Sequence, residues 1–154
     1  RYFQDGGKTG PHIIVNPLDG IPRPKKDGSG DTLRGDMNIR KYRHCVVEFD
    51  DLGRDDQIRF WSSARLPIVA LIDSGNKSIH AWLQVSKLAE VKTPEQWETT
   101  IKQRLYDRLL IPLGVDKACS NPARLSRLPG HFRQEKQAMQ RLLWISNEGR
   151  FVCQ

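Results

Sequence analysis

The sequence has few cysteines and no long apolar run. Its three cysteines, Cys45, Cys119 and Cys153, lie far apart and form no C-x-x-C pair. This spacing excludes a disulfide framework and a zinc ribbon, so we expect no zinc within this chain and a reducing, cytoplasmic compartment. No segment approaches the roughly 18 apolar residues of a spanning helix, and no signal-peptide pattern opens the chain. We therefore expect no membrane partner.

The chain is short and basic. At 154 residues it is long enough to bury a core, and we expect a single domain over residues 1–154. Because the first residue is Arg1, we expect that domain to be a fragment of a longer protein. The chain has 25 Lys and Arg against 18 Asp and Glu, a formal net charge of +7. This balance suits a polyanionic partner such as nucleic acid or nucleotides, although many soluble domains are also basic.

The pattern of apolar residues and turns predicts a mixed α+β domain. We predict strands at residues 12–15 and 43–50, and a hairpin of residues 68–73 and 78–85 around a Ser-Gly-Asn-Lys turn. We predict helices at residues 55–64, from Pro94 to before Pro112, and at 134–145. Residues 16–37 are rich in Gly, Pro and charge and predict a long loop, which is usually functional or mobile. Together these elements favour a largely antiparallel sheet packed by helices.

Two acids form the first motif that suggests chemistry. Glu48 and Asp50 stand two residues apart at the end of a strand, so their carboxylates leave the same face. The apolar residues Cys45, Val46 and Val47 before them predict a central strand. Two such carboxylates repel each other unless a cation lies between them, and Mg²⁺ or Mn²⁺ prefers these oxygen ligands. The alternative is a strand that simply ends in solvent.

A second motif follows the hairpin turn. Ser78 and His80 share one strand face directly after Lys77, and together with the turn's N–H groups they offer donors to a triphosphate. Trp82 on the same face either stacks a base or covers the sheet, and we favour the second.

A third motif combines an acid with arginines. Asp116 is followed by Arg124 and Arg127, with Arg133 further on, among small residues and prolines. Arginine forks match phosphate oxygens in a bidentate manner, although surface arginines on a loop would give the same pattern.

In this order, the three motifs resemble those of the archaeo-eukaryotic primase (AEP) superfamily, and of its primase-polymerases in particular. The matching runs are Glu48-Phe49-Asp50, then Ser78-Ile79-His80 after Asp73-Ser74-Gly75-Asn76-Lys77, then Val115-Asp116 with arginines eight and eleven residues on. The blocks HIIVNPLDG, VVEFDD, DSGNKSIHAWLQV and NPARLSRLPG also resemble primase domains of phages and mobile elements. The likeness spans roughly residues 12–143. The order Glu then Asp departs from the commoner Asp-x-Asp or Asp-x-Glu.

The resemblance implies a fold, a reaction and a role for each residue. The fold would be an RRM-like antiparallel sheet packed by helices, with an additional αβ unit, and the reaction metal-dependent primer synthesis or extension on single-stranded DNA. Glu48, Asp50 and Asp116 would hold two Mg²⁺ or Mn²⁺ ions. Lys77, Ser78, His80, Arg124 and Arg127 would bind the incoming NTP or dNTP. A helicase or accessory primase module would act from the same polypeptide or in trans.

A dense group of basic residues flanks the first acid motif, and we expect it to contact template or nucleotide phosphates. Its members are Lys25, Lys26, Arg34, Arg40, Lys41 and Arg43. Asp73 is an alternative third acid, but it directly precedes the turn and is better read as a turn residue. The main alternative function is a non-catalytic, RRM-like nucleic-acid-binding module, which predicts exposed stacking aromatics on the sheet and no convergence of acids. A phosphoesterase would also use the acid pair, and the absence of a His-x-His pair argues against a rolling-circle nuclease.

Overall fold

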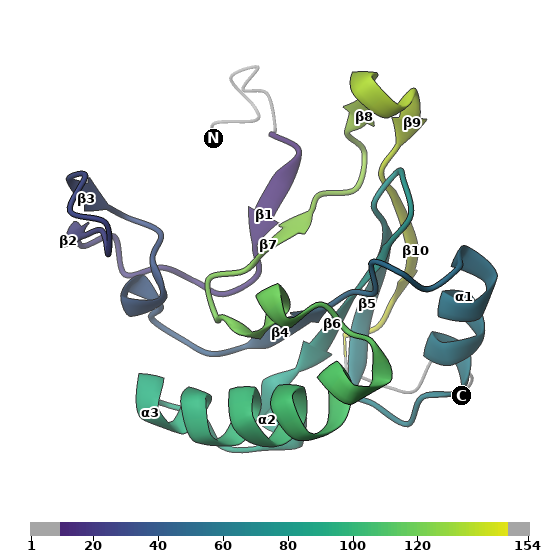
Figure 1. Cartoon of the computed structure of the whole chain (residues 1–154). Helices are drawn as coiled ribbons and strands as arrows, with labels where there is room; N and C mark the ends of the chain where they lie inside the picture. The colour runs from purple at the N-terminus through teal and green to yellow at the C-terminus, as the bar shows by residue number, and fades with distance from the viewer. Residues whose placement is uncertain (1–9, 148–154) are drawn as a thin grey trace.

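The computed structural model describes residues 10–147, which build an antiparallel sheet with helices packed on one face (Figure 1). The strands are β1 (His12–Ile14), β2 (Arg23–Pro24), β3 (Asp31–Thr32), β4 (His44–Val47), β5 (Ile68–Asp73), β6 (Ile79–Gln84), β7 (Leu125–Arg127), β8 (Phe132–Arg133), β9 (Ala138–Met139) and β10 (Arg141–Ile145). The helices are η1 (Asp36–Asn38), α1 (Arg54–Ser63), α2 (Val85–Leu88), α3 (Pro94–Gln96), η2 (Trp97–Leu110), η3 (Ile111–Leu113), η4 (Lys117–Ser120) and η5 (Gln134–Lys136). The predicted α+β class with a mostly antiparallel sheet is confirmed.

The main sheet has the strand order β10-β5-β6-β4, and every neighbouring pair is antiparallel. Its centre is the predicted hairpin of β5 and β6. Asp73 closes the turn, because its Oδ1 accepts the Gly75 N–H at 2.9 Å and its Oδ2 pairs with Arg54 at 2.8 Å. Gly75 has φ +68°, and a Cβ there would lie 3.2 Å from the Met139 carbonyl oxygen. The turn therefore needs glycine, and Asp73 is a turn residue.

The two faces of this sheet differ in character. One face is apolar, and the helices α1 and η2 cover it, with Trp61 and Trp97 packed against the strands. Sheet residues on that face are Cys45, Val47, Leu71, Ile79, Ala81 and Leu83. The alternate residues face the other side, where His44 lies beside Trp82 and where Glu48 and His80 also project. The polar motifs thus share the face that the helices leave open.

The helix that covers the sheet begins where the sequence predicts. Thr93 accepts the Gln96 N–H at 3.2 Å, and Gln96 Oε1 accepts the Thr93 N–H in return. This capping box and Pro94 start α3, which continues directly into η2. From η2, the Tyr106 hydroxyl donates to the Val46 carbonyl at 2.6 Å and ties the helix to β4.

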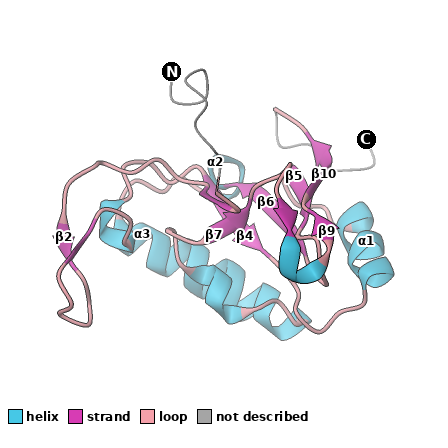
Figure 2. Cartoon of the chain, turned by 90° about the horizontal axis from the view of Figure 1, so that it is seen from above, coloured by secondary structure: helices cyan, strands magenta, loops and turns pink. Residues whose placement is uncertain are grey.

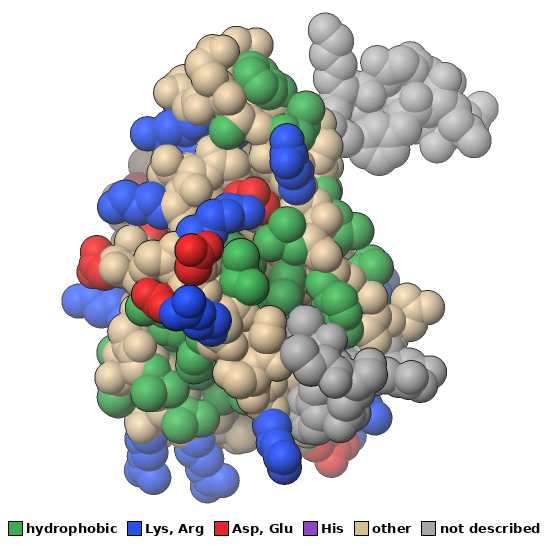
Figure 3. Space-filling model, turned by 90° about the vertical axis from the view of Figure 1, so that its right-hand side faces the viewer, with side chains coloured by type: hydrophobic (Ala, Val, Ile, Leu, Met, Phe, Trp, Pro, Cys, Tyr) green, Lys and Arg blue, Asp and Glu red, His purple; other side chains and the backbone are tan. Residues whose placement is uncertain are grey.

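Two sequence-based predictions about the sheet are wrong. Residues 134–145 are not a helix: they form η5, β9 and β10, and β10 pairs with β5 along its edge. Three of its apolar side chains, Leu142, Leu143 and Ile145, are exposed, and Figure 3 shows hydrophobic surface among basic side chains on this side of the molecule. The strand β4 lies at the other edge rather than at the centre, and η2 and Asn16 supply the burial that its apolar residues require.

The predicted long loop, residues 16–37, is more ordered than expected. It contains the small hairpin of β2 and β3, which Figures 1 and 2 place at the end of the molecule opposite α1. The buried Asn16 fixes the start of the loop, since its Oδ1 accepts the N–H groups of Arg43 and His44 at 2.7 and 2.9 Å. Among residues 10–147 no helix has the length and apolar character needed to cross a membrane.

Candidate active site

Three sequence-distant motifs meet at the end of β4. An isolated bridge joins Phe49 to Val115, and the Asp116 N–H donates to the Glu48 carbonyl at 3.0 Å. Because β4 also pairs with β6, the same strand end lies beside Ser78 and His80. The acid motif therefore connects the Ser-x-His strand on one side with the acid-and-arginine segment on the other.

Glu48 is the centre of the charge network. Its carboxylate is buried and accepts from four side chains. Oε2 lies 3.0 Å from His80 Nε2 and 3.1 Å from Ser78 Oγ, while Oε1 lies 2.5 Å from Arg124 Nη2 and 3.4 Å from Cys119 Sγ. Burial alone would raise the pKa of Glu48, but His80 and Arg124 outweigh it and hold the pKa well below its ordinary value. Glu48 is thus fixed as an anion.

Arg124 forms ion pairs with both Glu48 and Asp116, two predicted metal ligands that come from different sequence motifs. Its Nη2 lies 2.5 Å from Glu48 and 3.3 Å from Asp116 Oδ2. The other oxygen of Asp116 accepts the Ala118 N–H at 2.9 Å and caps η4. The guanidinium therefore occupies the space between two carboxylates and neutralises part of their repulsion.

Asp50 differs from both of these acids. It is exposed at the rim, and its side chain makes no hydrogen bond or ion pair with the described residues. Its pKa is raised, by burial and then by the negative charges of Glu48 and Asp116. Asp50 is thus a carboxylate of the site with no direct partner among the described residues. This property is expected of a residue that binds a cation.

His80 is held from both ring nitrogens. Opposite Glu48, its Nδ1 lies 3.2 Å from Ser126 Oγ, and Ser126 in turn accepts the Trp82 N–H at 2.7 Å. Trp82 is half-buried and its ring lies 6.2 Å from that of His44. Trp82 therefore covers the sheet, as we favoured from the sequence, and it anchors the chain of hydrogen bonds that orients His80.

Glu48, Asp50, Ser78, His80 and Arg124 line one polar cavity of about 370 Å³, and Asp116 is connected to it through its ion pair with Arg124. Its walls carry three arginines, Arg124, Arg127 and Arg133, against the carboxylates of Glu48 and Asp50. Burial and then Arg133 lower the pKa of Arg127. The whole lining is His12, Glu48, Asp50, Ser74, Asn76, Ser78, His80, Arg124, Leu125, Arg127 and Arg133. Guanidinium groups that repel one another in a polar cavity form a binding site for a polyanion.

The other predicted residues lie outside this cavity. Lys77 is exposed and does not line it, although its backbone carbonyl accepts from Gln57 at 3.1 Å. Of the six basic residues, Lys25, Lys26 and Arg34 line a neighbouring cavity of about 700 Å³. Arg40, Lys41 and Arg43 are exposed and line neither cavity.

The sequence-based set lacks several residues of the site, among them Ser126, His12 and Arg133. Ser126 and His12 enter through the pairing of β1 with β7, and that pairing has no signal in a short motif. Arg133 is buried and donates to the Ser74 carbonyl at 3.2 Å and to Glu135 at 2.8 Å. The sequence shows Arg133 after Arg124 and Arg127, but no neighbouring residue in the sequence distinguishes it from a surface arginine.

The donor set fits a divalent cation. Ligand atoms of Glu48, Asp116 and Cys119 lie within 4.8 Å of one another, and two of the three donors are the carboxylates that Mg²⁺ and Mn²⁺ prefer. Arg124 already places a positive charge between those two carboxylates. Asp50, the third predicted ligand, lines the rim of the cavity and does not belong to this group of ligand atoms.

Comparisons with known proteins support the fold. No protein-family model matches the sequence, and no curated protein resembles it significantly. Among solved structures, the AEP domain of the primase-polymerase of cyanophage S-2L matches with a TM-score of 0.57 and 24% sequence identity. The match covers 77% of this chain and 60% of that domain, so the chain corresponds to somewhat more than half of its length. The chain therefore has the fold of an AEP domain, as the motif order predicts.

Proposed function

We propose that this chain is the catalytic domain of a metal-dependent DNA primase-polymerase, a nucleotidyltransferase that makes or extends primers on single-stranded DNA. The observation that carries the proposal is the convergence of Glu48 and Arg124 with the Ser78–His80 strand in one polar cavity, where Arg124 also pairs with Asp116. The AEP fold supports this chemistry by analogy, since the neighbouring structure is a primase-polymerase domain.

The acids would hold the cations. Glu48, Asp50 and Asp116 would be the ligands, and bound Mg²⁺ or Mn²⁺ would lower the pKa of the attacking 3′-hydroxyl and neutralise the leaving pyrophosphate. Within the protein, the ion pairs of Glu48 keep that carboxylate deprotonated and in one orientation. Arg124 would also bind substrate, because it lines the cavity and its guanidinium would offer paired donors to phosphate oxygens.

The remaining residues would bind the triphosphate. Arg127 and Arg133 face the cavity with mutually unfavourable charge, which an anion relieves. His80 is fixed in orientation by Ser126 and Trp82, and its Nε2, which lies 3.0 Å from Glu48, would offer a donor to a phosphate oxygen at the cavity wall. Ser78 offers a hydroxyl beside it. Preorganised donors of this kind need little reorganisation when charge develops in the transition state.

The binding-module alternative is less consistent with the structure. It predicts an exposed aromatic on the sheet and no reason for acids to gather. Instead, Trp82 is half-buried and bonded to Ser126, and the acids Glu48 and Asp116 share one arginine.

The test is nucleotide incorporation by the purified chain on single-stranded DNA, with and without an annealed primer, in Mg²⁺ or Mn²⁺. We expect labelled product with the wild type, none with Asp50→Ala, and normal product with Asp51→Asn. Asp51 is the matched control because it carries the same charge one residue away and does not line the cavity. Tight DNA binding without product in any condition would instead favour the binding module.

A further inference from the structure

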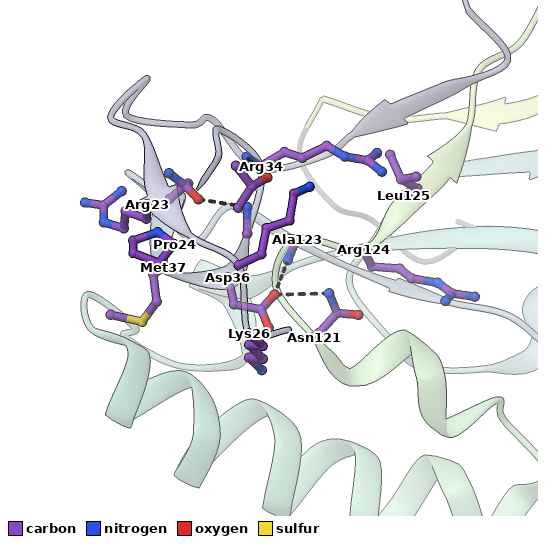
Figure 4. Close-up of a pocket in the computed structure, with 14 residues that line it drawn as sticks. Arg23, Pro24, Lys26, Arg34, Asp36, Met37, Asn121, Ala123, Arg124 and Leu125 are labelled. Carbon is purple, nitrogen blue, oxygen red and sulfur yellow. Dashed lines mark hydrogen bonds between the residues drawn. The ribbon is translucent and has the colours of Figure 1, made fainter. Parts of the chain in front are cut away.

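A second cavity of about 700 Å³ adjoins the active-site cavity, and Arg124 and Leu125 line both. It lies between the β2–β3 hairpin, η1 and residues 121–125, as Figure 4 shows. Its volume falls in the range of ligand pockets, about 300–1,000 Å³. We call it the hairpin cavity.

Two cations on its wall have no partner. Within residues 10–147, the side chains of Lys26 and Arg34 make no hydrogen bond or ion pair. Arg34 extends across the cavity toward Leu125 (Figure 4). Lys25 contacts only the Ser29 hydroxyl, at 3.3 Å, whereas Arg23 is paired with Asp19 at 2.6 Å. Arg34 therefore offers free positive charge at the end of the hairpin cavity that adjoins the active site, whereas the Lys26 side chain extends in a different direction (Figure 4).

The hairpin cavity also has a fixed framework. Asp36, a carboxylate in its lining, is hydrogen-bonded to the facing segment. Its Oδ1 accepts from Asn121 Nδ2 at 3.1 Å and from the Ala123 N–H at 3.2 Å (Figure 4). These bonds tie the hairpin segment to the residues just before Arg124. Asp36 thus holds the wall in place through Oδ1, and it makes no ion pair with Lys26 or Arg34.

The rest of the lining is largely apolar. Pro24, Ala123 and Leu125 contribute hydrophobic surface, and Met37 is 62% exposed. A thioether and a guanidinium are both good contacts for the face of an aromatic ring. The combination of free cations with an apolar wall matches a ligand that has a phosphate at one end and a base at the other.

We propose that the hairpin cavity binds one nucleotide of the single-stranded template, with the phosphates on its two sides bound by Lys26 and Arg34 and its base on the apolar wall to which Met37 and Leu125 contribute. The inference rests on the proposed function and adds to it a second nucleotide position beside the incoming one. The shared residues Arg124 and Leu125 connect the two positions. A free nucleoside triphosphate has the same chemistry, so the test separates the two sources.

The experiment measures binding of fluorescent single-stranded DNA by anisotropy over a salt series, and of a free nucleoside triphosphate by calorimetry. The variants are Lys26→Gln/Arg34→Gln and, as a matched control, Arg65→Gln/Lys87→Gln, which removes two exposed cations that line neither cavity. We expect the first pair to weaken DNA binding about tenfold. Its log–log salt slope should fall by about 1.4, since each contact to a single strand contributes about 0.7. The control pair should change both values much less.

A third variant tests the base contact. Met37→Ala should weaken DNA binding about threefold with an unchanged salt slope, because it removes apolar contact and no charge. If the double variant loses triphosphate binding and keeps DNA binding, the cavity holds a free nucleotide and the template assignment is wrong. If it loses neither, the cavity does not bind a nucleotide.

These readouts are independent of catalysis. If the variants show the expected changes in DNA binding but the wild-type chain incorporates no nucleotide, the hairpin-cavity proposal is supported and the proposed function is contradicted. Wild-type chain that incorporates nucleotide, with unchanged DNA binding in the double variant, would overturn the hairpin cavity alone.

Discussion

The active-site cavity and the hairpin cavity share Arg124 and Leu125, yet they arrange charge in opposite ways. In the active-site cavity Glu48 accepts from four side chains and Arg124 pairs with two carboxylates, while Asp50 and Arg127 make no side-chain hydrogen bond or ion pair with the described residues. In the hairpin cavity Lys26 and Arg34 are exposed, and their side chains make no hydrogen bond or ion pair with the described residues. The active-site cavity thus contains a network of side chains that hold one another in place. The hairpin cavity instead presents cations that are available to a ligand.

This difference separates stability from binding. Removing one member of a buried charge network leaves another buried charge unpaired, so folding and chemistry change together. Removing an exposed cation costs little in stability and acts only on the ligand. Asp50 differs from Glu48 inside the active-site cavity, because it is exposed and makes no ion pair with the described residues, so its chemistry can be tested with little disturbance of the fold.

The largest effect is expected for Asp50→Asn. Nucleotide incorporation should fall at least about a hundredfold, while DNA affinity stays near the wild-type value. The melting temperature in chelator should stay the same or rise, because the substitution removes a charge that burial, and then the carboxylates of Glu48 and Asp116, disfavour. Incorporation assays, anisotropy and thermal melts on one preparation measure all three.

Asp51→Asn serves as the control for that variant, and it should keep full activity. Activity of Asp50→Asn near the wild-type level would remove Asp50 from the metal site. A loss of activity that parallels a loss of folded protein would show that Asp50 acts through structure.

A second prediction compares two arginines of the same cavity. Arg124→Ala should lower the free energy of unfolding by about 2 kcal/mol, because it leaves the buried Glu48 with His80 as its remaining basic partner. Arg127→Gln should be neutral or slightly stabilising, since Arg127 is repelled by Arg133. Urea unfolding in chelator gives both values. Equal losses for the two variants would contradict the network.

A third prediction concerns acid stability. The pKa of Glu48 in the folded chain lies below its ordinary value of 4.5, so the unfolded chain takes up the proton first. Glu48 therefore stabilises the fold above about pH 4.5, and that contribution is lost as the pH falls toward the folded pKa. The stability advantage of wild type over Glu48→Gln, measured by urea unfolding in chelator, should be constant above about pH 5 and shrink below it. An advantage that grows on acidification would contradict this.

Local signals in the sequence identified the hairpin of β5 and β6 and the start of α3. Asp73 with Gly75 and Thr93 with Gln96 each close their own turn or cap, so no distant residue is needed to predict them. The prediction of a helix at residues 134–145 was wrong for the opposite reason. Their apolar spacing fits a helix, but pairing with β5, far away in the sequence, decides the outcome.

The candidate site divides in the same way. Glu48, Ser78, His80, Asp116 and Arg124 lie in short motifs and do come together. Ser126 reaches His80 only because β7 pairs with β1, and no local pattern marks that pairing. Free cations such as Lys26 carry no positional signal beyond their charge, so the sequence predicted a basic surface but not a cavity.

The smallest effect is expected for Trp82→Leu. In the active-site cavity this ring supports Ser126 and through it His80, so its loss should raise the nucleotide KM modestly and leave DNA affinity unchanged within about twofold. If the sheet itself bound DNA by stacking, removing the ring would cost about 1–3 kcal/mol per base. Anisotropy with single-stranded DNA separates these outcomes. A large loss of DNA affinity would indicate that DNA binds to the sheet rather than to the hairpin cavity. It would favour the non-catalytic binding module.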